Sequence, residues 1–253
     1  ATYTFTGLTA STAYQFRHRV RDAAGNVTTG TAVSKTTAAT PPEVVPSGAY
    51  DDAALALAPT FYLPLDDPAG TDSPRTLGAA TAKTYTINGS VTFGAPGIGD
   101  GATATQFGGS GYMSSTGGYT GATAPVSVAC LAKLTTADSG ILSDGSVIVG
   151  VLGGKLALRT GSTTYTSTGK TLTPGTRYHL GWVATGSEVR FYVNGALDST
   201  VPATFSGGGG ATSPGLGLGK FALATLAGMV GKGGAAWTAT EMGQLAQAAG
   251  LKS

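Results

Sequence analysis

A hairpin pattern in residues 177–197 constrains the fold of this chain more than any other segment. Apolar and polar side chains alternate on both sides of a turn at residues 185–188, and Asn194-Gly195 follows as a second turn. Alternation with a period of two is typical of strands that bury one face, and Asn-Gly is a frequent two-residue turn. We therefore predict two antiparallel strands inside a larger β-sheet.

Counting outward from the turn assigns each side chain of this hairpin to a face, because successive side chains of a strand point to opposite sides. The large apolar side chains share one face, which we predict to be the core face. Its cross-strand pairs are Ala184 with Val189, Trp182 with Phe191, and Leu180 with Val193. The opposite face receives His179, Arg190 and Tyr192.

The composition fits an all-β protein and excludes several other classes. The 253 residues include 41 glycines, 41% are hydrophobic and only 11% are charged. A low charge with this apolar fraction predicts a folded chain, and abundant Gly and Thr favour many turns between strands. The net charge of +2, without a Lys/Arg cluster, gives no reason to expect nucleic acid as a partner. No apolar run reaches the length of a membrane helix, so we expect no membrane insertion.

The sequence lacks the residue sets of common catalytic and metal sites. Its two histidines, His18 and His179, lie far apart, and neither an HExxH motif nor a GxSxG motif is present. The single cysteine, Cys130, excludes an internal disulfide and a cysteine-rich zinc site, and its alternation with valines predicts a core position. We expect no enzyme, no cofactor and no metal.

Residues 1–40 resemble the C-terminal part of a fibronectin type III domain. The resemblance rests on Leu8, Tyr14, Phe16 and Val20, followed by Asp-Ala-Ala-Gly-Asn at residues 22–26. It implies three strands, with Tyr14 as the corner tyrosine, although His18 stands where an apolar residue is usual. Three strands cannot close a two-sheet sandwich, so we expect that upstream sequence was removed or that another chain covers this segment. Because the chain starts with alanine, we also expect a processed or trimmed product.

A proline-rich linker is expected at residues 41–48, and residues 49–253 resemble a laminin-G-like, concanavalin A-like domain. The matching segments are FYLPLDDPAGT, YHL with VRFYVNG, and GMVGKGGAAWTATEMGQLA. They imply an all-β, antiparallel two-sheet jelly-roll sandwich with short helices. We expect the helices at residues 50–59 and 237–249, the second capped by Thr238 or Thr240 and docked by Trp237 and Leu245. The other strands are expected at residues 61–65, 84–93 (a hairpin turning at Asn88-Gly89), 102–107, 112–115, 125–134, 140–150, 155–160, 163–168, 215–218 and 229–236.

This combination of modules most resembles bacteriophage tail and bacterial surface proteins. The resemblance implies a non-catalytic adhesion module that binds a host cell-surface glycan, a location on the virion or cell surface, contacts with other appendage subunits, and a homotrimer. Relatives often hold calcium on the rim, but Lys232 stands where they carry acids, so we expect it to pair with a carboxylate of Asp66, Asp67 or Asp72 instead.

We expect the ligand to contact a concave face, where aromatic rings stack on sugars and cations donate hydrogen bonds. The candidate residues are Tyr192, Arg190 and His179 on the hairpin, with Tyr112, Tyr119 and Tyr165 in glycine- and threonine-rich loops. The alternatives are an ordinary solvent or interface face and tyrosines that pack within loops. Two other functions remain open, a structural decoration or spacer domain and a carbohydrate-binding accessory of a secreted enzyme.

Overall fold

The structure, a computed structural model, divides the chain into two compact units, Ala1–Val45 and Pro46–Ser253. It describes residues 12–36, 48–71, 74–78, 84–98, 103–115, 124–144, 147–205, 216–218 and 224–251. Most of the expected linker at residues 41–48 therefore lies outside the described residues. The domain boundaries expected from the sequence stay predictions.

The described part of the first unit is a two-stranded antiparallel ribbon that is interrupted once. Its strands are β1 (Ala13–Phe16) paired with β4 (Val33–Thr36), and β2 (Arg19–Arg21) paired with β3 (Val27–Thr29). Asp22 closes the turn, because its carboxylate accepts hydrogen bonds from the backbone N–H and the side-chain amide of Asn26, both at 2.8 Å. The fibronectin resemblance also implies an earlier strand around Leu8, and this segment lies outside the described residues.

The second unit consists of strands and two short helices. Its elements are α1 (Ala49–Ala56), β5 (Phe61–Leu63), β6 (Thr86–Ala95), β7 (Ala104–Ser114), β8 (Val126–Leu134), β9 (Ser139–Asp144), β10 (Val147–Leu152), β11 (Lys155–Thr160), β12 (Thr163–Thr166), β13 (Arg177–Ala184), β14 (Glu188–Val193), β15 (Ala196–Pro202), β16 (Leu216–Leu218), β17 (Ala224–Gly233) and α2 (Ala239–Ala248). No helix in the described ranges is long and apolar enough to cross a membrane.

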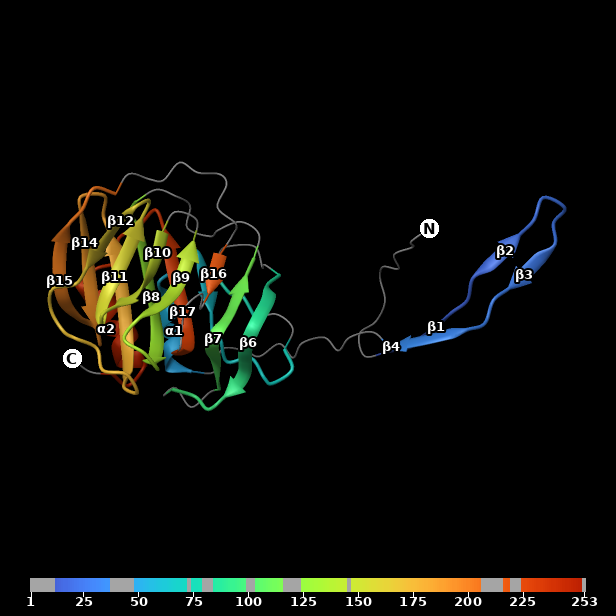
Figure 1. Cartoon of the computed structure of the whole chain (residues 1–253), viewed down its shortest axis with the longest axis horizontal. Helices are drawn as coiled ribbons and strands as arrows, with labels where there is room; N and C mark the ends of the chain where they lie inside the picture. Colours follow the sequence, from blue (N-terminus) through green and yellow to red (C-terminus); the bar gives the residue numbers. More distant parts are fainter. Residues whose placement is uncertain are drawn as a thin grey trace. The chain divides into compact units, whose positions relative to one another are not determined.

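The strands form one antiparallel path that folds back on itself as a sandwich (Figure 1). The path runs β12-β11-β10-β9-β16-β7-β17-β8-β13-β14-β15, with β5 beside β17 and β6 beside β7. Side chains from both halves meet in one core, where Trp182 and Phe191 share a cluster with Val149 and Leu158. This confirms the expected all-β sandwich.

The hairpin of β13 and β14 has the register that alternation predicts. Trp182 pairs with Phe191, Leu180 with Val193, and the turn closes through the Thr185 N–H, which donates to the Glu188 carbonyl at 3.0 Å. The core-face side chains are buried, and so is Cys130 on the neighbouring strand β8, as expected. Burial in these apolar surroundings raises the pKa of the Cys130 thiol, so the thiol stays protonated.

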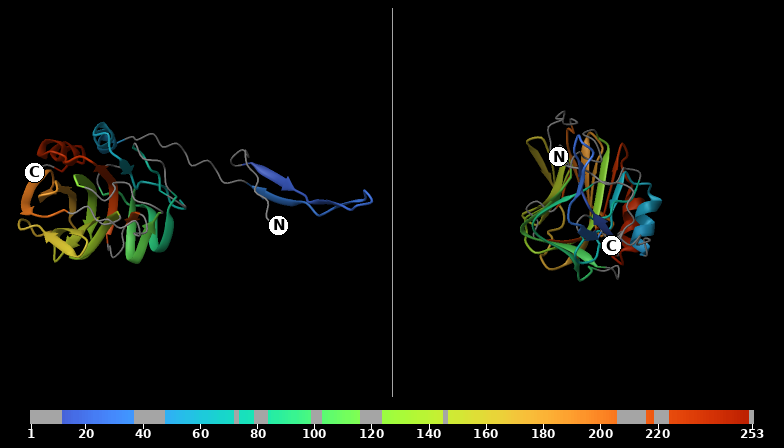
Figure 2. Two further views of the ribbon diagram at one scale, coloured as in Figure 1. Left: turned by 90° about the horizontal axis from the view of Figure 1, so that it is seen from above. Right: turned by 90° about the vertical axis from the view of Figure 1, so that its right-hand side faces the viewer.

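Both helices lie on the outer face of the half that contains β8, β13 and β17 (Figure 2). Trp237 and Leu245 are buried there, which confirms the predicted docking of α2. Gly181 of β13 makes room for this contact, because a Cβ at that position would overlap the Met242 side chain. The helices therefore bury a sheet face that the alternation pattern alone predicts to be exposed.

A capping box starts α2, and Thr238 rather than Thr240 is the cap. Thr238 Oγ1 accepts from the Glu241 N–H at 3.2 Å, and Glu241 Oε2 accepts from the Thr238 N–H at 2.7 Å. These two bonds satisfy backbone N–H groups that the helix itself cannot pair.

Thr238→Ala is expected to lower the free energy of unfolding by about 1 kcal/mol, because it leaves the start of α2 without its cap. Urea unfolding followed by tryptophan fluorescence measures the change, since Trp237 immediately precedes the cap. The matched control is Thr240→Ala in the exposed first turn, which we expect to have little effect. Equal losses in both variants would contradict the assignment of the cap.

Two glycine-containing segments that the sequence marks as turns are strand interiors. The expected hairpin at residues 84–93 is wrong: β6 runs through Asn88 and Gly89 with a register shift against β7. Gly89 has a φ of +65° and lies close to the backbone of Ser110 and Gly111, which explains the glycine. Likewise, the expected strands 102–107 and 112–115 are the two ends of a single strand, β7.

Two further expectations are corrected in the second half of the domain. The segment expected as one strand at residues 140–150 is the antiparallel pair β9 and β10. The strand β15, which follows the Asn194-Gly195 turn and pairs with β14, is absent from the expected set. The turn itself was the available signal for β15, because an Asn-Gly turn normally returns the chain into a neighbouring strand.

Candidate functional site

The hairpin face expected to contact a ligand is largely covered by the helices. Tyr192 is 1% exposed and His179 is 0% exposed, and Tyr192 shares an apolar cluster with Trp237 and Met242. The expectation that these two side chains form an open binding face is therefore wrong. The reason is tertiary: α1 and α2 bury their apolar sides on the face that alternation assigns to Tyr192 and His179.

His179 is held inside this helix-covered layer. Its ring meets the ring of Tyr50 edge-on, with centroids 5.9 Å apart, and its backbone N–H donates to Asn194 Oδ1 at 3.0 Å. Within the described part of the chain, neither ring nitrogen has a hydrogen-bond partner. Burial lowers the pKa of His179 from 6.5 to about 3, so the imidazole is neutral at neutral pH.

The other candidate side chains are spread over the domain. Arg190 is half-buried and forms an ion pair with Glu188 at 2.6 Å, and the hydrogen bond to Glu188 raises the pKa of the guanidinium. Tyr112 and Tyr165 lie in strands β7 and β12 and not in loops, while Tyr119 lies outside the described residues. The structure thus does not assemble the predicted set into one site.

Tyr165 lines a cavity of about 310 Å³ between the end of β15 and β12. Its hydroxyl donates to the Thr204 carbonyl at 3.3 Å, and the other lining residues are Ser187, Pro202, Ala203 and Thr204. In the part of the chain that the structure describes, the Tyr165 phenol is the one ionisable side chain that lines this cavity. It therefore offers little chemistry for recognising a specific ligand.

A second cavity crosses the open face of β9, β10, β11 and β12. These strands lie on the side of the sandwich away from the helices (Figures 1 and 2). The floor of the cavity is a cross-strand row of small residues: Gly150 pairs with Gly140 on one side and with Ala157 on the other. The next positions on the same face carry the larger Ile148, Leu152 and Arg159. Since residues two apart share a face, the small row lies between taller rows and forms a groove of about 340 Å³.

This groove combines apolar walls with a few polar groups. Ile148 and Leu152 are 37% and 52% exposed, so the apolar walls of the groove face solvent. Thr164 lies opposite Arg159 on β12, and Asp138 lies at the other margin, where its carboxylate accepts from the Gly153 N–H at 2.6 Å. We refer to this cavity as the β9–β12 groove.

The acidic residues near the start of the sandwich form an ion-pair cluster with Arg75. Arg75 Nη2 lies 2.7 Å from Asp66 Oδ1, and its Nε lies 3.9 Å from Asp67 Oδ1. Burial raises the pKa of Asp67, although hydrogen bonding and charge from Arg75 act in the opposite direction. The expected pairing of Lys232 with Asp66 or Asp67 is wrong, because Arg75 pairs with both carboxylates and Lys232 Nζ donates to the Leu57 carbonyl at 2.8 Å. Asp72, the third expected partner, lies outside the described residues. Within the described ranges, no group of three His, Cys, Asp or Glu side chains is arranged to hold a metal.

Comparison with known proteins gives a likeness of fold. No protein-family model and no curated protein matches the sequence. The binding domain of botulinum neurotoxin DC, solved with rat synaptotagmin II, superposes with a TM-score of 0.56 at 9% identity, over 75% of this chain and 51% of that one. The botulinum neurotoxin type G receptor binding domain gives 0.51 at 9% identity, over 75% and 51% of the two chains.

A mutant of Trypanosoma rangeli sialidase that displays trans-sialidase activity is a third match, with a TM-score of 0.52 at 11% identity, over 78% of this chain and 34% of that one. This chain thus spans about half of the two neurotoxin domains and a third of the sialidase. The superpositions show a shared β-sandwich fold, and at identities this low the likeness is one of fold alone. The more specific resemblances to laminin-G-like and fibronectin type III domains stay predictions.

Proposed function

We propose that this chain is a non-catalytic recognition module that binds a cell-surface glycan in the β9–β12 groove. The observation that carries the proposal is the row of Gly140, Gly150 and Ala157 between larger side chains, at a register shift between β9 and β10. A volume of about 340 Å³ lies at the lower end of the range for small-molecule sites. Aliphatic walls with a hydroxyl and a guanidinium at the margins suit a sugar ring, which has apolar faces and a polar edge.

The residues around the groove support binding without catalysis. Most glycoside hydrolases need two carboxyl groups that flank the scissile bond. Among the described residues, the groove is lined by one carboxylate, Asp138, which already accepts a backbone hydrogen bond from Gly153. The neurotoxin domains that share the fold are named as binding or receptor-binding domains, and this analogy of fold adds weight in the same direction.

The setting of the module follows from the sequence resemblance. We propose an extracellular or virion location, on a bacteriophage tail or another surface appendage, with several copies assembled side by side, a homotrimer being the first expectation. A shallow groove of this kind is expected to bind one glycan weakly, with a Kd of about 0.1–1 mM. Several copies on one appendage then supply avidity.

Filling the groove is expected to abolish binding without unfolding the domain. Ala157 forms one end of the floor on the open face of β11 and is 8% exposed, so Ala157→Leu places extra volume in the groove and not in the core. On a glycan array, we expect this variant to lose at least about tenfold in affinity for glycans that the natural chain binds. Leu197→Phe, an enlargement on exposed β15, is the matched control. Unchanged binding by Ala157→Leu, or no glycan binding by the natural chain, would contradict the proposed function.

A structural or spacer role is the second candidate, and the first unit favours it. Three valines of the ribbon, Val20, Val27 and Val33, are 61%, 46% and 54% exposed. Exposed apolar side chains on a two-stranded ribbon are typical of a surface that another polypeptide covers. Light scattering, which gives the oligomeric state, and hydrogen exchange of the ribbon together test this candidate. If the chain is a monomer and its ribbon is nevertheless protected from exchange, assembly through these valines is contradicted.

A further inference from the structure

We propose that the β9–β12 groove recognises an acidic saccharide and that Arg159 binds its acid group. This inference rests on the proposed function. It adds the charge class of the ligand and names the residue that binds the acid group. It also replaces the aromatic stacking expected from the sequence, because none of the described residues that line the groove is aromatic.

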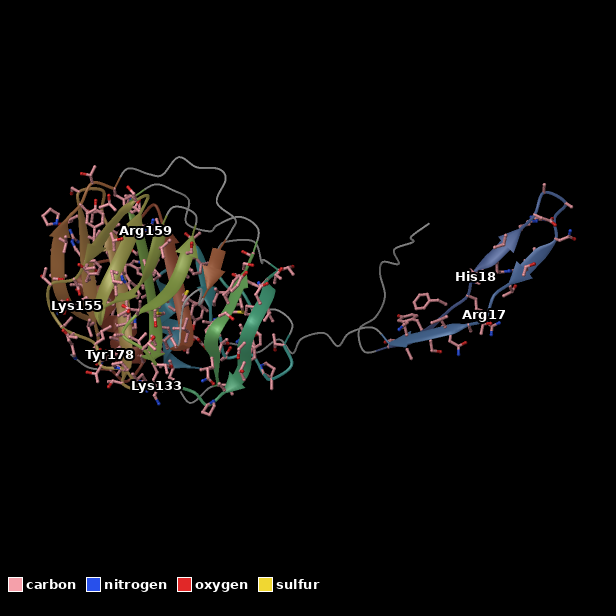
Figure 3. All side chains as sticks on the ribbon, in the orientation of Figure 1. Arg17, His18, Lys133, Lys155, Arg159 and Tyr178 are labelled. Atoms are coloured by element: carbon pink, nitrogen blue, oxygen red, sulfur yellow. The ribbon has the colours of Figure 1, made fainter. Side chains whose placement is uncertain are left out.

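The position of Arg159 places a cation at the wall of the groove. Lys155, Ala157 and Arg159 alternate along β11, so all three side chains belong to the same open face of the sheet. Figure 3 labels Lys155 and Arg159. Ala157 forms the floor, and Arg159 forms part of the wall beside Ile148, its cross-strand partner. A ligand that lies on Ala157 therefore has the guanidinium within reach of its edge.

The guanidinium of Arg159 is oriented but not neutralised. Its Nε donates to the Gly161 carbonyl at 3.1 Å, which ties the side chain to the turn between β11 and β12. Among the described residues, the ion pairs involve Arg75 and Arg190, and no carboxylate pairs with Arg159. The two terminal nitrogens thus remain available for the bidentate contact that a guanidinium makes with a carboxylate or a sulfate.

The other charged groups near this face are already engaged. Lys155 Nζ donates to the Gly169 carbonyl, next to Asp198, whose carboxylate accepts from the Lys170 N–H at 2.6 Å. Asp138 accepts from Gly153, as described above, and remains able to accept from a sugar hydroxyl with its second oxygen. Lys155 does not line the groove, so among the described lining residues Arg159 is the cation that an acidic ligand meets.

The groove fits a saccharide better than an extended peptide. A peptide that binds as an added strand needs an unpaired sheet edge. The floor of the groove lies across central strands: β10 is paired with β9 and β11, and β11 is paired with β10 and β12. Recognition in the groove must therefore use side chains, and Thr164 and Arg159 present a hydroxyl and a guanidinium group.

The test compares matched ligands on the full chain by titration calorimetry or NMR. The probes are a glucuronate-containing disaccharide, its neutral glucose counterpart, a sulfated analogue and an acidic peptide. We expect the acidic sugars to bind at least about tenfold more tightly than the neutral one, and Arg159→Gln to remove that difference while neutral binding persists. Arg159→Lys should keep part of the preference, and Lys133→Gln, an exposed cation on β8 outside the groove lining, should keep all of it.

The outcomes separate this inference from the proposed function. Glycan binding that is blocked by Ala157→Leu but shows no preference for acidic sugars, or a preference that survives Arg159→Gln, overturns the inference and leaves the proposed function intact. Preference for the acidic peptide over every sugar overturns the assignment of a saccharide. Absence of binding to every glycan overturns both. The ratio of the affinities for the carboxylated and the sulfated sugar identifies which acid group the guanidinium prefers.

Discussion

Trp182→Ala is expected to lower the free energy of unfolding of the second unit by about 3–5 kcal/mol, the largest effect of any single substitution considered for this chain. Trp182 is 0% exposed, pairs with Phe191 on β14 and with Val128 on β8, and lies in the core between the two halves of the sandwich. Its truncation removes buried apolar surface and leaves a cavity that a rigid pair of sheets can only partly fill. Urea unfolding followed by far-UV circular dichroism measures the loss.

Two further variants show whether the cavity is the cause. Trp182→Phe keeps most of the ring volume and removes an indole N–H that has no hydrogen-bond partner among the described residues, so it should cost much less than Trp182→Ala. Arg190→Ala, on the opposite face of the same hairpin, removes a surface ion pair and should cost about 1 kcal/mol or less. If Arg190→Ala destabilises the chain as much as Trp182→Ala, the assignment of the core face is wrong.

Local patterns predict the elements that depend on local chemistry. The hairpin of β13 and β14 follows from alternation and a short turn, and the start of α2 follows from the Thr-x-x-Glu sequence of a capping box. Both signals act over a few residues, so no distant partner can override them easily. The core positions of Trp182, Phe191 and Cys130 follow from the same local periodicity.

Glycine misleads where its role depends on a distant strand. Gly89 and the glycines at residues 108–111 have the sequence signature of turns, yet they allow β6 and β7 to approach closely around a register shift. A turn and a bulge both need a backbone without a Cβ, so the sequence cannot distinguish them without the pairing partner.

The candidate site depends entirely on such long-range arrangement. Whether Tyr192 and His179 face solvent is decided by the docking of α1 and α2, which are far away in the sequence. The β9–β12 groove exists because Gly140, Gly150 and Ala157 are paired across three strands, at a register shift between β9 and β10. With residues 140–150 assigned to one strand, that row cannot be recognised.

The second large prediction concerns the buried His179. We expect the free energy of unfolding of the second unit to fall as the pH drops below about 6.5. In the unfolded chain His179 titrates near its ordinary pKa of 6.5, whereas burial holds the pKa at about 3 in the folded protein. Between these two values the unfolded state binds a proton that the folded state rejects. Each pH unit in this window therefore costs about 1.4 kcal/mol, and the loss approaches about 4–5 kcal/mol near pH 3.

Urea unfolding at several pH values between 7 and 3 measures this slope, and both tryptophans, Trp182 and Trp237, report from the second unit. Asp67 acts in the opposite direction, because burial raises its pKa in the folded state and its protonation therefore favours folding. The comparison with variants isolates the histidine: His179→Leu should flatten the slope, while His18→Gln, a change of the other histidine in the exposed ribbon, should leave it unchanged. A slope that persists in His179→Leu would mean that carboxylates and not His179 govern acid unfolding, and that the imidazole accepts a proton without leaving the helix-covered layer.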